Sequence, residues 1–426
     1  MTDPAHVVRE VVARHPRCFW LDGGGAREWS GRRSIVGWLD DNDVSLSYSA
    51  ARREVVRHVG GRAEVVGDDV FDVLGAELDA DRASGGRGQW FGYLGYAARP
   101  DLPAAPDPWL PDAVWLRPSH VRRFDHPPGP AASDPGRVPA AGATTGGGHT
   151  TPPPADYAAA FATVQEHLHA GDTYEANLTY RLDRPGPPDP LAVYLRLRAL
   201  SPAPYAGFLQ HDVDGARAWL LSSSPERFAL VDHDGAGRVV ETKPIKGTTP
   251  RGATAADDEE QRHRLATDPR YRAENLMIVD LLRHDLAHVC EVGSVEVPAL
   301  MAVESYAGVH QLVSTVRGRL RDDVATLAAL RVLFPAGSMT GAPKLRTMQV
   351  VEAVEATPRG AYAGAFGWVA ADGRADLGVV IRSLLTRGDG VYRLGTGGGI
   401  TVHSDLDGEW AETRLKTDRL LRALAG

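Results

Sequence analysis

The chain has 426 residues, 43% of them hydrophobic, so it is long enough for one large or two ordinary globular domains. Its 47 basic and 55 acidic residues are interspersed and give a formal net charge of −8, and the absence of a dense basic block argues against a nucleic-acid-binding protein. Two cysteines cannot form a disulfide framework, and no run of about 18 apolar residues could span a membrane. The first residues do not resemble a signal peptide, so we expect a soluble, cytoplasmic protein.

Short strand-like runs characterise the N-terminal part, at 34–38 and 114–116, with an aromatic and glycine-rich stretch at 90–96. None of them carries a convincing catalytic constellation. Residues 125–156 are rich in proline, glycine, alanine and threonine and lack apolar periodicity, which predicts a flexible linker. The expected organisation is therefore an N-terminal α+β region (1–124), the linker (125–156) and a catalytic domain (157–426).

Strands and helices are mixed in the C-terminal part. Helices are expected over 157–170, where Gly171 ends the pattern, and over the apolar-rich segment 271–290. The strand candidates are 218–222, 238–241, 362–369 and 379–385. Because strands and helices do not alternate regularly, we predict the α+β class with largely antiparallel strands.

Lysine is rare in this chain. Of the 47 basic residues 43 are arginines, and the four lysines are Lys243, Lys246, Lys344 and Lys416. Arginine can replace lysine on a solvated surface, but not where an amine must lose its proton. Each remaining lysine is therefore a candidate for amine chemistry, or an accidental survivor of the compositional bias.

Lys246 carries the sharpest local signal. It follows a strand-like run and lies between Pro244 and Gly247, which places its amine at a strand end where it could act as a nucleophile; the alternative is a lysine in a surface turn. Glu226 ends another strand-like run. If the strands 218–222 and 238–241 pair, Glu226 and Lys246 can meet; otherwise Glu226 belongs to a capped turn with a surface salt bridge.

Two helical segments offer carboxylates. Glu274 lies near the start of a helix whose middle is apolar, and an acidic side chain buried there needs a compensating cation. Glu409, Glu412 and Lys416 share one helical face. Two glutamates from separate helices, with water and substrate oxygens, would suit Mg²⁺, although a solvated helix face explains the second segment equally simply.

Glycine-rich segments and one isolated arginine could hold anions. The segment 334–344 resembles a loop that enters a helix, whose amides and Lys344 could bind an anion. The run 395–400 allows a ligand to approach the backbone closely, or is a bulged strand. Arg382 is a charge in an otherwise apolar strand, so a carboxylate of the substrate is a credible partner.

Taken in order, these motifs resemble the chorismate-utilising enzymes. The match runs from about residue 171 to 420 and consists of GDTYEAN (171–177), SPERF (224–228), PIKGT (244–248), AENLMIVDLLRHDL (273–286), VHQLVSTV (309–316), FPAGSMTGAPK (334–344), RGAYAGAFG (359–367), GGGI (397–400) and EWAETRLK (409–416). The resemblance implies a fold of two large antiparallel β-sheets packed as a sandwich, with helices outside.

Within the family, PIKGT is similar to the aminodeoxychorismate synthase component I branch, since anthranilate synthases have alanine where Lys246 stands. The resemblance implies that Lys246 attacks C2 of chorismate while the C4 hydroxyl leaves, and that ammonia then enters at C4 and expels the lysine. Glu226 would protonate the departing hydroxyl, which is a poor leaving group without a proton donor.

Further roles follow from the same resemblance. Glu274 and Glu412 resemble ligands of Mg²⁺, with Glu409 in support through water. The remaining positions resemble groups that hold the substrate: Arg382, Tyr362, Ser338, Gly397, Gly398, Gly399, Lys416, Thr248, His310 and Glu175, where a packing role for His310 is nearly as probable.

Three positions depart from the family pattern. Tyr271 stands where an acidic residue usually supports the metal, Glu175 stands where the amine-transferring branches usually have glutamine, and His284 replaces an asparagine. Isochorismate-forming relatives carry a water-activating lysine at position 175. C2 chemistry giving anthranilate, aminodeoxyisochorismate or isochorismate, and a weakly active or non-catalytic chorismate-binding homologue, therefore remain alternatives.

The source of ammonia is expected outside this chain. Neither Cys18 nor Cys290 lies in a turn typical of a glutaminase nucleophile. The resemblance therefore implies a separate glutamine amidotransferase subunit, component II, as the partner, with chorismate as substrate and neither nucleic acid nor membrane as a ligand.

Overall fold

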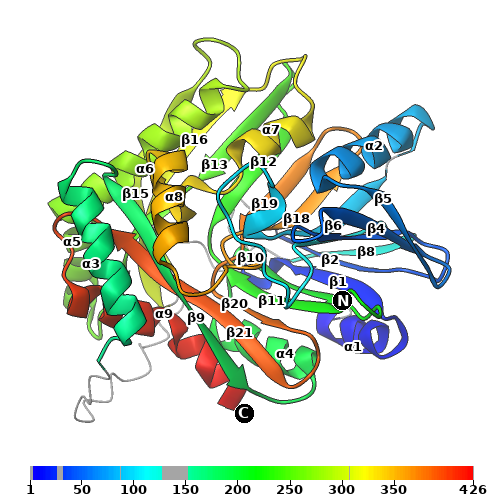
Figure 1. Ribbon diagram of the computed structural model, residues 1–426, viewed down its shortest axis with the longest axis horizontal. Coiled ribbons are helices and arrows are strands. Elements are labelled where there is room, and N and C mark those ends of the chain that lie inside the picture. The colour runs from blue at the N-terminus through cyan, green and yellow to red at the C-terminus, as the bar shows by residue number, and fades with distance from the viewer. Residues whose placement is uncertain (1–2, 26–31, 87, 127–151, 307, 426) are drawn as a thin grey trace.

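Antiparallel strands from both halves of the chain form the centre of the molecule (Figure 1). The computed structural model describes residues 3–25, 32–86, 88–126, 152–306 and 308–425. The strands of the first sheet are β1 (Arg17–Asp22), β2 (Arg33–Trp38), β8 (His120–Asp125), β9 (Glu175–Pro185), β10 (Tyr205–His211), β11 (Ala218–Ser224), β17 (Gly341–Ala342), β20 (Ser383–Thr386) and β21 (Val391–Ile400). Those of the second sheet are β3 (Ser45–Ser49), β4 (Glu54–Val59), β5 (Arg62–Gly67), β6 (Gln89–Leu94), β7 (Ala113–Leu116), β12 (Arg227–His233), β13 (Arg238–Lys243), β14 (Ile245–Pro250), β15 (Glu296–Ser305), β16 (Val309–Arg319), β18 (Ala365–Ala370) and β19 (Ala375–Val379).

The order of the strands joins distant parts of the sequence. The first sheet runs β17-β9-β21-β20-β11-β10-β1-β2-β8, and the second runs β14-β16-β13-β12-β19-β18-β6-β7-β3-β4-β5, with β15 paired to β16. All pairings between these strands are antiparallel. The predicted α+β class with two large antiparallel sheets is therefore confirmed.

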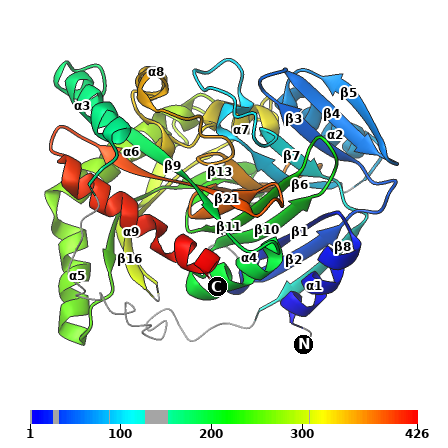
Figure 2. The same ribbon diagram turned by 60° about the horizontal axis from the view of Figure 1, so that its bottom comes forward.

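Helices cover the outer faces of the sheets (Figures 1 and 2). Their bounds are α1 (Pro4–Arg14), α2 (Val70–Ala83), α3 (Ala155–His169), α4 (Pro190–Leu200), α5 (Ala255–Thr267), α6 (Pro269–Ala287), α7 (Thr326–Leu333), α8 (Lys344–Val354) and α9 (Leu406–Ala425). Apolar residues of α1, α4 and α9 pack on the first sheet, and those of α2, α6 and α7 pack on the second. Within the described residues, no helix is long and apolar enough to cross a membrane.

A third apolar cluster lies between the two sheets. Phe19 of β1 stacks on Phe91 of β6 with ring centroids 4.1 Å apart, and Leu209 of β10 and Phe366 of β18 belong to the same buried cluster. Burial of such side chains is the main favourable term in folding. The cluster fixes the sheets face to face, so loops that cross from one sheet to the other are held rigidly.

Most of the expected elements are observed, with two corrections. The helix expected over 271–290 is α6, which begins at Pro269 because Asp268 caps it by accepting a hydrogen bond from the Arg270 amide. The strand expected over 379–385 is instead broken into β19 and β20, because the chain crosses between the sheets at 380–382. Similarly, the strand expected to begin at Tyr362 begins at Ala365.

The proposed linker falls mostly on residues 127–151, which lie outside the described residues. Strands that precede this segment and strands that follow it share both sheets. The division at 125–156 stays a prediction.

Candidate active site

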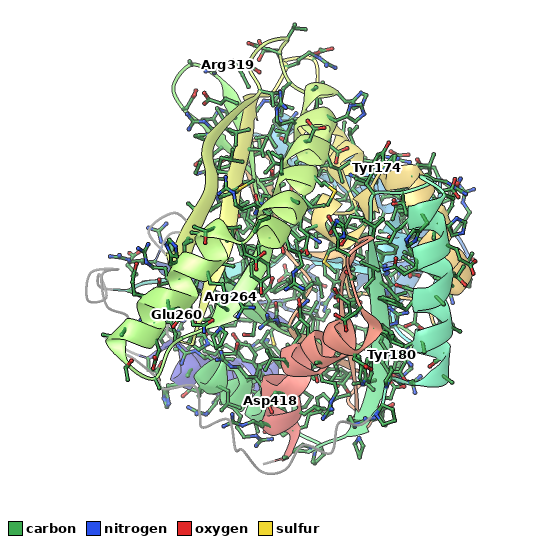
Figure 3. The ribbon with its side chains drawn as sticks, turned by 90° about the vertical axis from the view of Figure 1, so that its left-hand side faces the viewer. Tyr174, Tyr180, Glu260, Arg264, Arg319 and Asp418 are labelled. Atoms are coloured by element: carbon green, nitrogen blue, oxygen red, sulfur yellow. The ribbon has the colours of Figure 1, made fainter. Side chains whose placement is uncertain are left out.

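A cavity between the two sheets gathers most of the predicted site residues. Its lining comes from β9, β14, β16, β21, α6 and α9, from the crossovers at 225–226 and 381–382, and from Ser338, Met339 and Tyr362. Of the predicted residues it contains Glu226, Lys246, Thr248, Glu274, Ser338, Tyr362, Arg382, Gly397, Gly398, Gly399, Glu412 and Lys416. Figure 3 shows α9, which carries Asp418, lying across the front of the strands between α5 and β9. The sequence therefore predicted residues that fold into one place.

Glu226 and Arg382 each lie in a segment that crosses from one sheet to the other. Glu226 lies between β11 of the first sheet and β12 of the second, and Arg382 lies between β19 and β20. Two backbone hydrogen bonds tie the crossovers together, from the Val379 amide to the Glu226 carbonyl (3.0 Å) and from the Ser223 amide to the Arg382 carbonyl (3.2 Å). Both side chains can thus face the cavity from the gap between the sheets.

The route by which Glu226 meets Lys246 differs from our expectation. The strands 218–222 and 238–241 do not pair, because β11 belongs to the first sheet and β13 to the second. Instead β12, which begins directly after Glu226, pairs with β13 through the partners Arg227 and Lys243. The hairpin β12–β13 therefore places Glu226, directly before β12, near Lys246, which follows the end of β13.

A bulge directs Lys246. β13 and β14 both pair with β16, separated by Pro244, and the register of β14 shifts between Ile245 and Thr248. Gly247, inside this irregularity, has φ +93, a conformation that favours glycine. Bulges re-aim side chains next to functional sites, and here the amine of Lys246 is placed in the cavity, 9% exposed.

Carboxylates surround the Lys246 amine. Its Nζ contacts Oε1 of Glu175, a residue of β9 that is itself 0% exposed. Burial lowers the pKa of Lys246, but Glu175, Glu274 and Glu226 together raise it above its usual value. Lys246 is therefore an ammonium in the free protein.

The glycines of β21 make room for these groups. A Cβ at Gly399 would meet Glu175 Oε1 and would lie 2.7 Å from Lys246 Nζ, and one at Gly398 would lie 2.9 Å from Glu409 Oε2. At Gly397 the obstacle is the backbone of β9. From the sequence we expected these glycines to let a ligand approach the backbone closely. In the structure, side chains of this protein itself occupy part of the space that the glycines leave.

Glu226 has the properties of a proton donor at neutral pH. It is 4% exposed and accepts a hydrogen bond of 2.5 Å from the Ser338 hydroxyl. Burial raises its pKa to about 7, although Ser338 and Lys246 act in the opposite direction. A carboxyl with this pKa is protonated often enough near pH 7 to serve as a general acid.

Arg382 is an unneutralised cation at the cavity. Within the described part of the chain its guanidinium makes neither a hydrogen bond nor an ion pair, and burial lowers its pKa. Its backbone has φ +51, which is uncommon for a residue with a side chain and occurs where function requires it. Tyr362 lies beside it in the lining. This arrangement suits a carboxylate of a ligand.

Glu274 and Glu412 are suited to a divalent cation. Glu274 makes no hydrogen bond or ion pair with another described residue, and its pKa is raised to about 7 by burial, with Glu175, Glu412 and Glu409 adding to the increase. The Lys246 ammonium acts in the opposite direction from a distance, and no cation is bonded directly to this carboxylate among the described residues. Among the described residues no group of three or more His, Cys, Asp or Glu could hold a metal alone, but Mg²⁺ needs only one or two carboxylates with water and anionic substrate oxygens. The donor set therefore fits Mg²⁺.

Lys416 and Glu409 are held by neighbours on and near α9. Lys416 Nζ bonds Glu412 Oε1 at 2.8 Å and the Gly397 carbonyl at 2.7 Å. Glu409 accepts a hydrogen bond of 2.7 Å from the Ser404 hydroxyl and lies outside the lining. Lys416 thus faces the cavity with part of its charge already neutralised.

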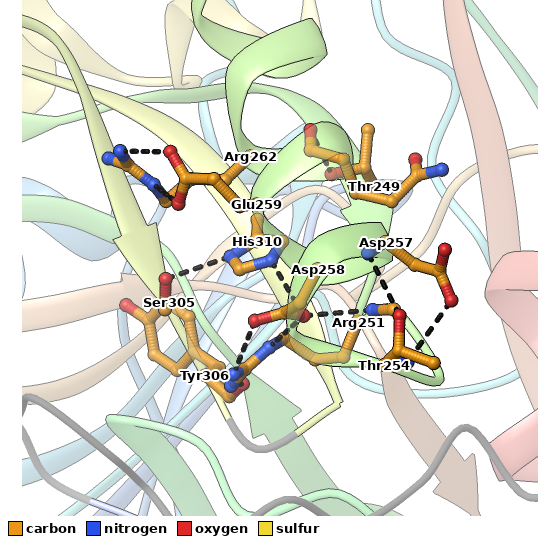
Figure 4. Close-up of polar contacts among 12 residues, drawn as sticks. Thr249, Arg251, Thr254, Asp257, Asp258, Glu259, Arg262, Ser305, Tyr306 and His310 are labelled. Carbon is orange, nitrogen blue, oxygen red and sulfur yellow. Dashed lines mark hydrogen bonds and ion pairs between the residues drawn. The ribbon is translucent and has the colours of Figure 1, made fainter.

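His310 lies away from the cavity. Its ring bonds Asp258 Oδ1 (3.1 Å) and the Ser305 hydroxyl (2.8 Å), as Figure 4 shows. The neighbouring Gln311 lines the cavity instead, with a buried Oε1 that has no partner among the described residues. Because successive side chains of a strand point to opposite faces, the alternation in β16 is the signal that could have selected Gln311.

Lys344 serves the fold. It begins α8, and its amine bonds Asp285 Oδ2 (2.5 Å) and the Leu333 carbonyl (3.0 Å). The segment 334–344 nevertheless contributes Ser338 and Met339 to the lining. Asn177 also lines the cavity and was not singled out from the sequence.

Several named proteins are similar to this chain in sequence. Aminodeoxychorismate synthase of Streptomyces pristinaespiralis is 40% identical over 97% of this chain and 62% of its own length, so this chain spans less than two thirds of that relative. Aminodeoxychorismate synthase component 1 of Escherichia coli is 40% identical over 63% of this chain and 57% of its own length. Anthranilate synthase component 1 of Streptomyces coelicolor is 35% identical over 89% of this chain and 82% of its own length.

Solved structures share the fold. Anthranilate synthase component I from Streptococcus pneumoniae matches with a TM-score of 0.70 and 24% identity, covering 91% of this chain and 92% of the other. A putative 2,3-dihydroxybenzoate-specific isochorismate synthase of Bacillus anthracis matches with a TM-score of 0.70 and 17% identity, covering 98% and 99%. The family model described as chorismate binding enzyme matches residues 17–422. The chain belongs to the chorismate binding enzyme family.

Proposed function

We propose that the protein aminates chorismate at C4 with ammonia to give 4-amino-4-deoxychorismate, as the synthase component of an aminodeoxychorismate synthase. The observation that carries the proposal is a buried lysine, Lys246, and a carboxyl with a pKa of about 7, Glu226, in one cavity. The relatives of 40% identity that are named aminodeoxychorismate synthase support it. The product would lie on a route to para-aminobenzoate.

The chemistry divides into two displacements at Lys246. The free amine of Lys246 attacks C2, both conjugated double bonds of the ring shift, and the C4 hydroxyl leaves as water with the proton of Glu226. Ammonia then attacks C4, both double bonds shift back, and Lys246 leaves C2 as an amine. The new C4 ammonium returns a proton to Glu226, so the net reaction is chorismate plus ammonia to product plus water.

The other groups of the cavity orient the substrate. Arg382, with Tyr362 beside it, would bind a carboxylate of chorismate, and the amides of 397–399, Thr248 and Lys416 would complete the pocket. Glu274 and Glu412 would hold Mg²⁺, which when bound neutralises substrate charge near the reacting ring. Glu409 would act through its neighbours on α9.

Ammonia would come from a separate glutamine amidotransferase. Both cysteines of the chain are buried, Cys18 at 1% and Cys290 at 2% exposure, and burial raises the pKa of Cys290 to about 11. A glutaminase nucleophile needs an accessible thiolate. Neither thiol fits that task, and the Escherichia coli relative is named as component 1.

The decisive experiment is identification of the product. The protein is incubated with chorismate, Mg²⁺ and ammonium, and the product is analysed by chromatography and mass spectrometry. Formation of 4-amino-4-deoxychorismate supports the proposal. Anthranilate would instead support C2 amination, the second candidate, which the Streptomyces coelicolor relative favours because this chain covers 82% of its length.

A further inference from the structure

We propose that Glu175 is the proton acceptor that converts Lys246 from an ammonium into the free amine and keeps that proton while Lys246 is bonded to the substrate. This inference rests on the proposed function of Lys246 as a nucleophile. Glu175 contacts the reacting amine and takes its proton, so it acts as a general base for Lys246, although it lies outside the lining of the cavity.

The geometry singles out Glu175 among the nearby acids. Its Oε1 contacts the Lys246 amine, and both side chains are buried, at 0% and 9% exposure. Gly399 lies directly against the pair, and any side chain there would displace it. The contact is therefore built into the strands β9, β14 and β21.

The charged groups that face Lys246 have different tasks. Glu226, from the crossover before β12, is bonded to Ser338 and is suited to protonate the leaving hydroxyl. Glu274 of α6 and Glu412 of α9 act on the amine through charge, and no hydrogen bond joins either of them to it among the described residues. Of the acids that the structure describes around Lys246, Glu175 alone is placed to take a proton directly.

The side chain of Glu175 is buried and, within the described part of the chain, incompletely hydrogen-bonded. Its Oε2 is buried and has no hydrogen-bond partner among the described residues. Burying a charged group costs free energy, and the neutral acid and amine leave no charge to bury at this contact. Transfer of the proton from Lys246 to Glu175 gives that neutral pair without exchange with solvent.

The protons balance over the cycle. Lys246 gives one proton to Glu175, and its lone pair then forms the C2–N bond while the C4–O bond breaks and water leaves with the proton of Glu226. The adduct is a secondary ammonium, from which Lys246 departs as a neutral amine when ammonia adds at C4. Glu175 then returns its proton to Lys246 and restores the resting ion pair.

The pH dependence of a Glu175→Gln variant tests this directly. In the wild type the reactive neutral pair has the same number of protons as the resting pair, whereas in the variant Lys246 must lose a proton to solvent. The ratio of variant to wild-type kcat/KM for chorismate is expected to rise about tenfold per pH unit between about pH 6 and 8, until Lys246 of the variant is deprotonated. Taking the ratio cancels the ionisation of ammonia, chorismate and Glu226.

Two results separate this role from a structural one. A ratio that is constant with pH would overturn the proposal, because loss of packing lowers activity equally at every pH. The conservative variant Glu175→Asp keeps a carboxylate and is expected to give a pH-independent ratio, even if its activity is lower. A pH-dependent ratio for this variant would also contradict the proposal.

A second measurement needs no substrate. Trace acetylation with acetic anhydride at several pH values, read by mass spectrometry, reports the deprotonation midpoint of each of the four lysines. In Glu175→Gln the midpoint of Lys246 is expected to fall by about one unit or more, because one opposite charge is removed. Lys344 and Lys416 serve as internal controls and should not shift, and an unchanged midpoint for Lys246 would refute the pairing.

The outcomes distinguish this inference from the proposed function. If wild-type protein makes a product other than 4-amino-4-deoxychorismate, the proposed function fails, while the labelling experiment still tests the ion pair. If the product is the expected one and the activity ratio is flat, the function stands and the role of Glu175 fails.

Discussion

Two nearly buried lysines, Lys246 and Lys344, show how the same side chain serves chemistry in one region and stability in another. Lys344 is matched by one carboxylate, Asp285, and one carbonyl, and burial lowers its pKa because a single carboxylate does not offset the loss of water. Burial also lowers the pKa of Lys246, yet three carboxylates more than offset it. The carboxylates around Lys246 therefore carry more negative charge than its single positive charge, whereas Lys344 is matched by one carboxylate.

The difference teaches what to look for around a buried amine. The groups at Lys344 satisfy one another, and Lys344 does not line the cavity that contains Lys246. Those at Lys246 leave a buried oxygen of Glu175 unpaired, and they line a cavity that also contains the unneutralised Arg382. Unsatisfied charge beside a cavity indicates a site completed by substrate and metal.

The largest expected effect comes from replacing each lysine by arginine. Lys246→Arg keeps the positive charge beside Glu175, but a guanidinium does not become a free amine near neutral pH. Amination at C4 is expected to fall by about 10³-fold or more, since the covalent route is lost. Lys344→Arg should retain activity within about threefold because only an ion pair is required there. Steady-state product formation measures the activity of both variants. Comparable losses of activity in the two variants would contradict the assignment of Lys246 to chemistry and Lys344 to stability.

Removing the charge of Lys344 tests its structural role. Lys344→Met leaves Asp285 buried without its cation, and loss of one partner of a buried pair is expected to lower the free energy of unfolding by about 3 kcal/mol. Urea denaturation measures this change. The double variant Lys344→Met with Asp285→Asn should recover part of the loss, because no unpaired charge remains; a single variant as stable as the wild type would show that the pair is dispensable.

The acid assigned to Glu226 gives a pH dependence of known sign. Its pKa of about 7 means that the protonated form, which donates to the leaving hydroxyl, disappears as the pH rises above 7, so kcat should fall by about tenfold per pH unit there. Glu226→Gln should lower kcat by about 10²-fold and abolish this decline. The measurement is the pH profile of kcat at constant free ammonia, and a decline that persists in the variant would assign the acid elsewhere.

Much of the site could be predicted because its chemistry is local. Lys246 stood out through the scarcity of lysine and its setting between Pro244 and Gly247, and Glu226 preceded an apolar strand. The arrangement of the sheets could not be derived in the same way. Whether 218–222 pairs with 238–241 depends on long-range contacts, and the structure places these strands in different sheets.

Other errors have specific physical causes. The run 379–385 has the composition of one strand, and only the crossover at Arg382, with its positive φ, divides it. Lys344 and Lys246 have similar local sequences of proline, lysine and glycine, so their different partners could not be known beforehand. The ion pair between Glu175 and Lys246 joins residues 71 positions apart and became visible only in the folded chain.

The smallest expected effect on stability and activity comes from replacing Arg382, whose unneutralised guanidinium lines the same cavity as Lys246. Arg382→Gly relieves a positive φ and removes a buried unpaired cation, so the free energy of unfolding should rise by about 1 kcal/mol, measured as a small increase in Tm. The same change removes a charge-assisted contact to a substrate carboxylate, and KM for chorismate should rise by about tenfold. Arg382→Lys is the matched control, because it keeps the charge and the strain and should leave Tm unchanged with a smaller increase in KM. A lower Tm in Arg382→Gly would mean that the guanidinium stabilises the fold, as Lys344 does. Arg382 would then have a structural role, unlike Lys246.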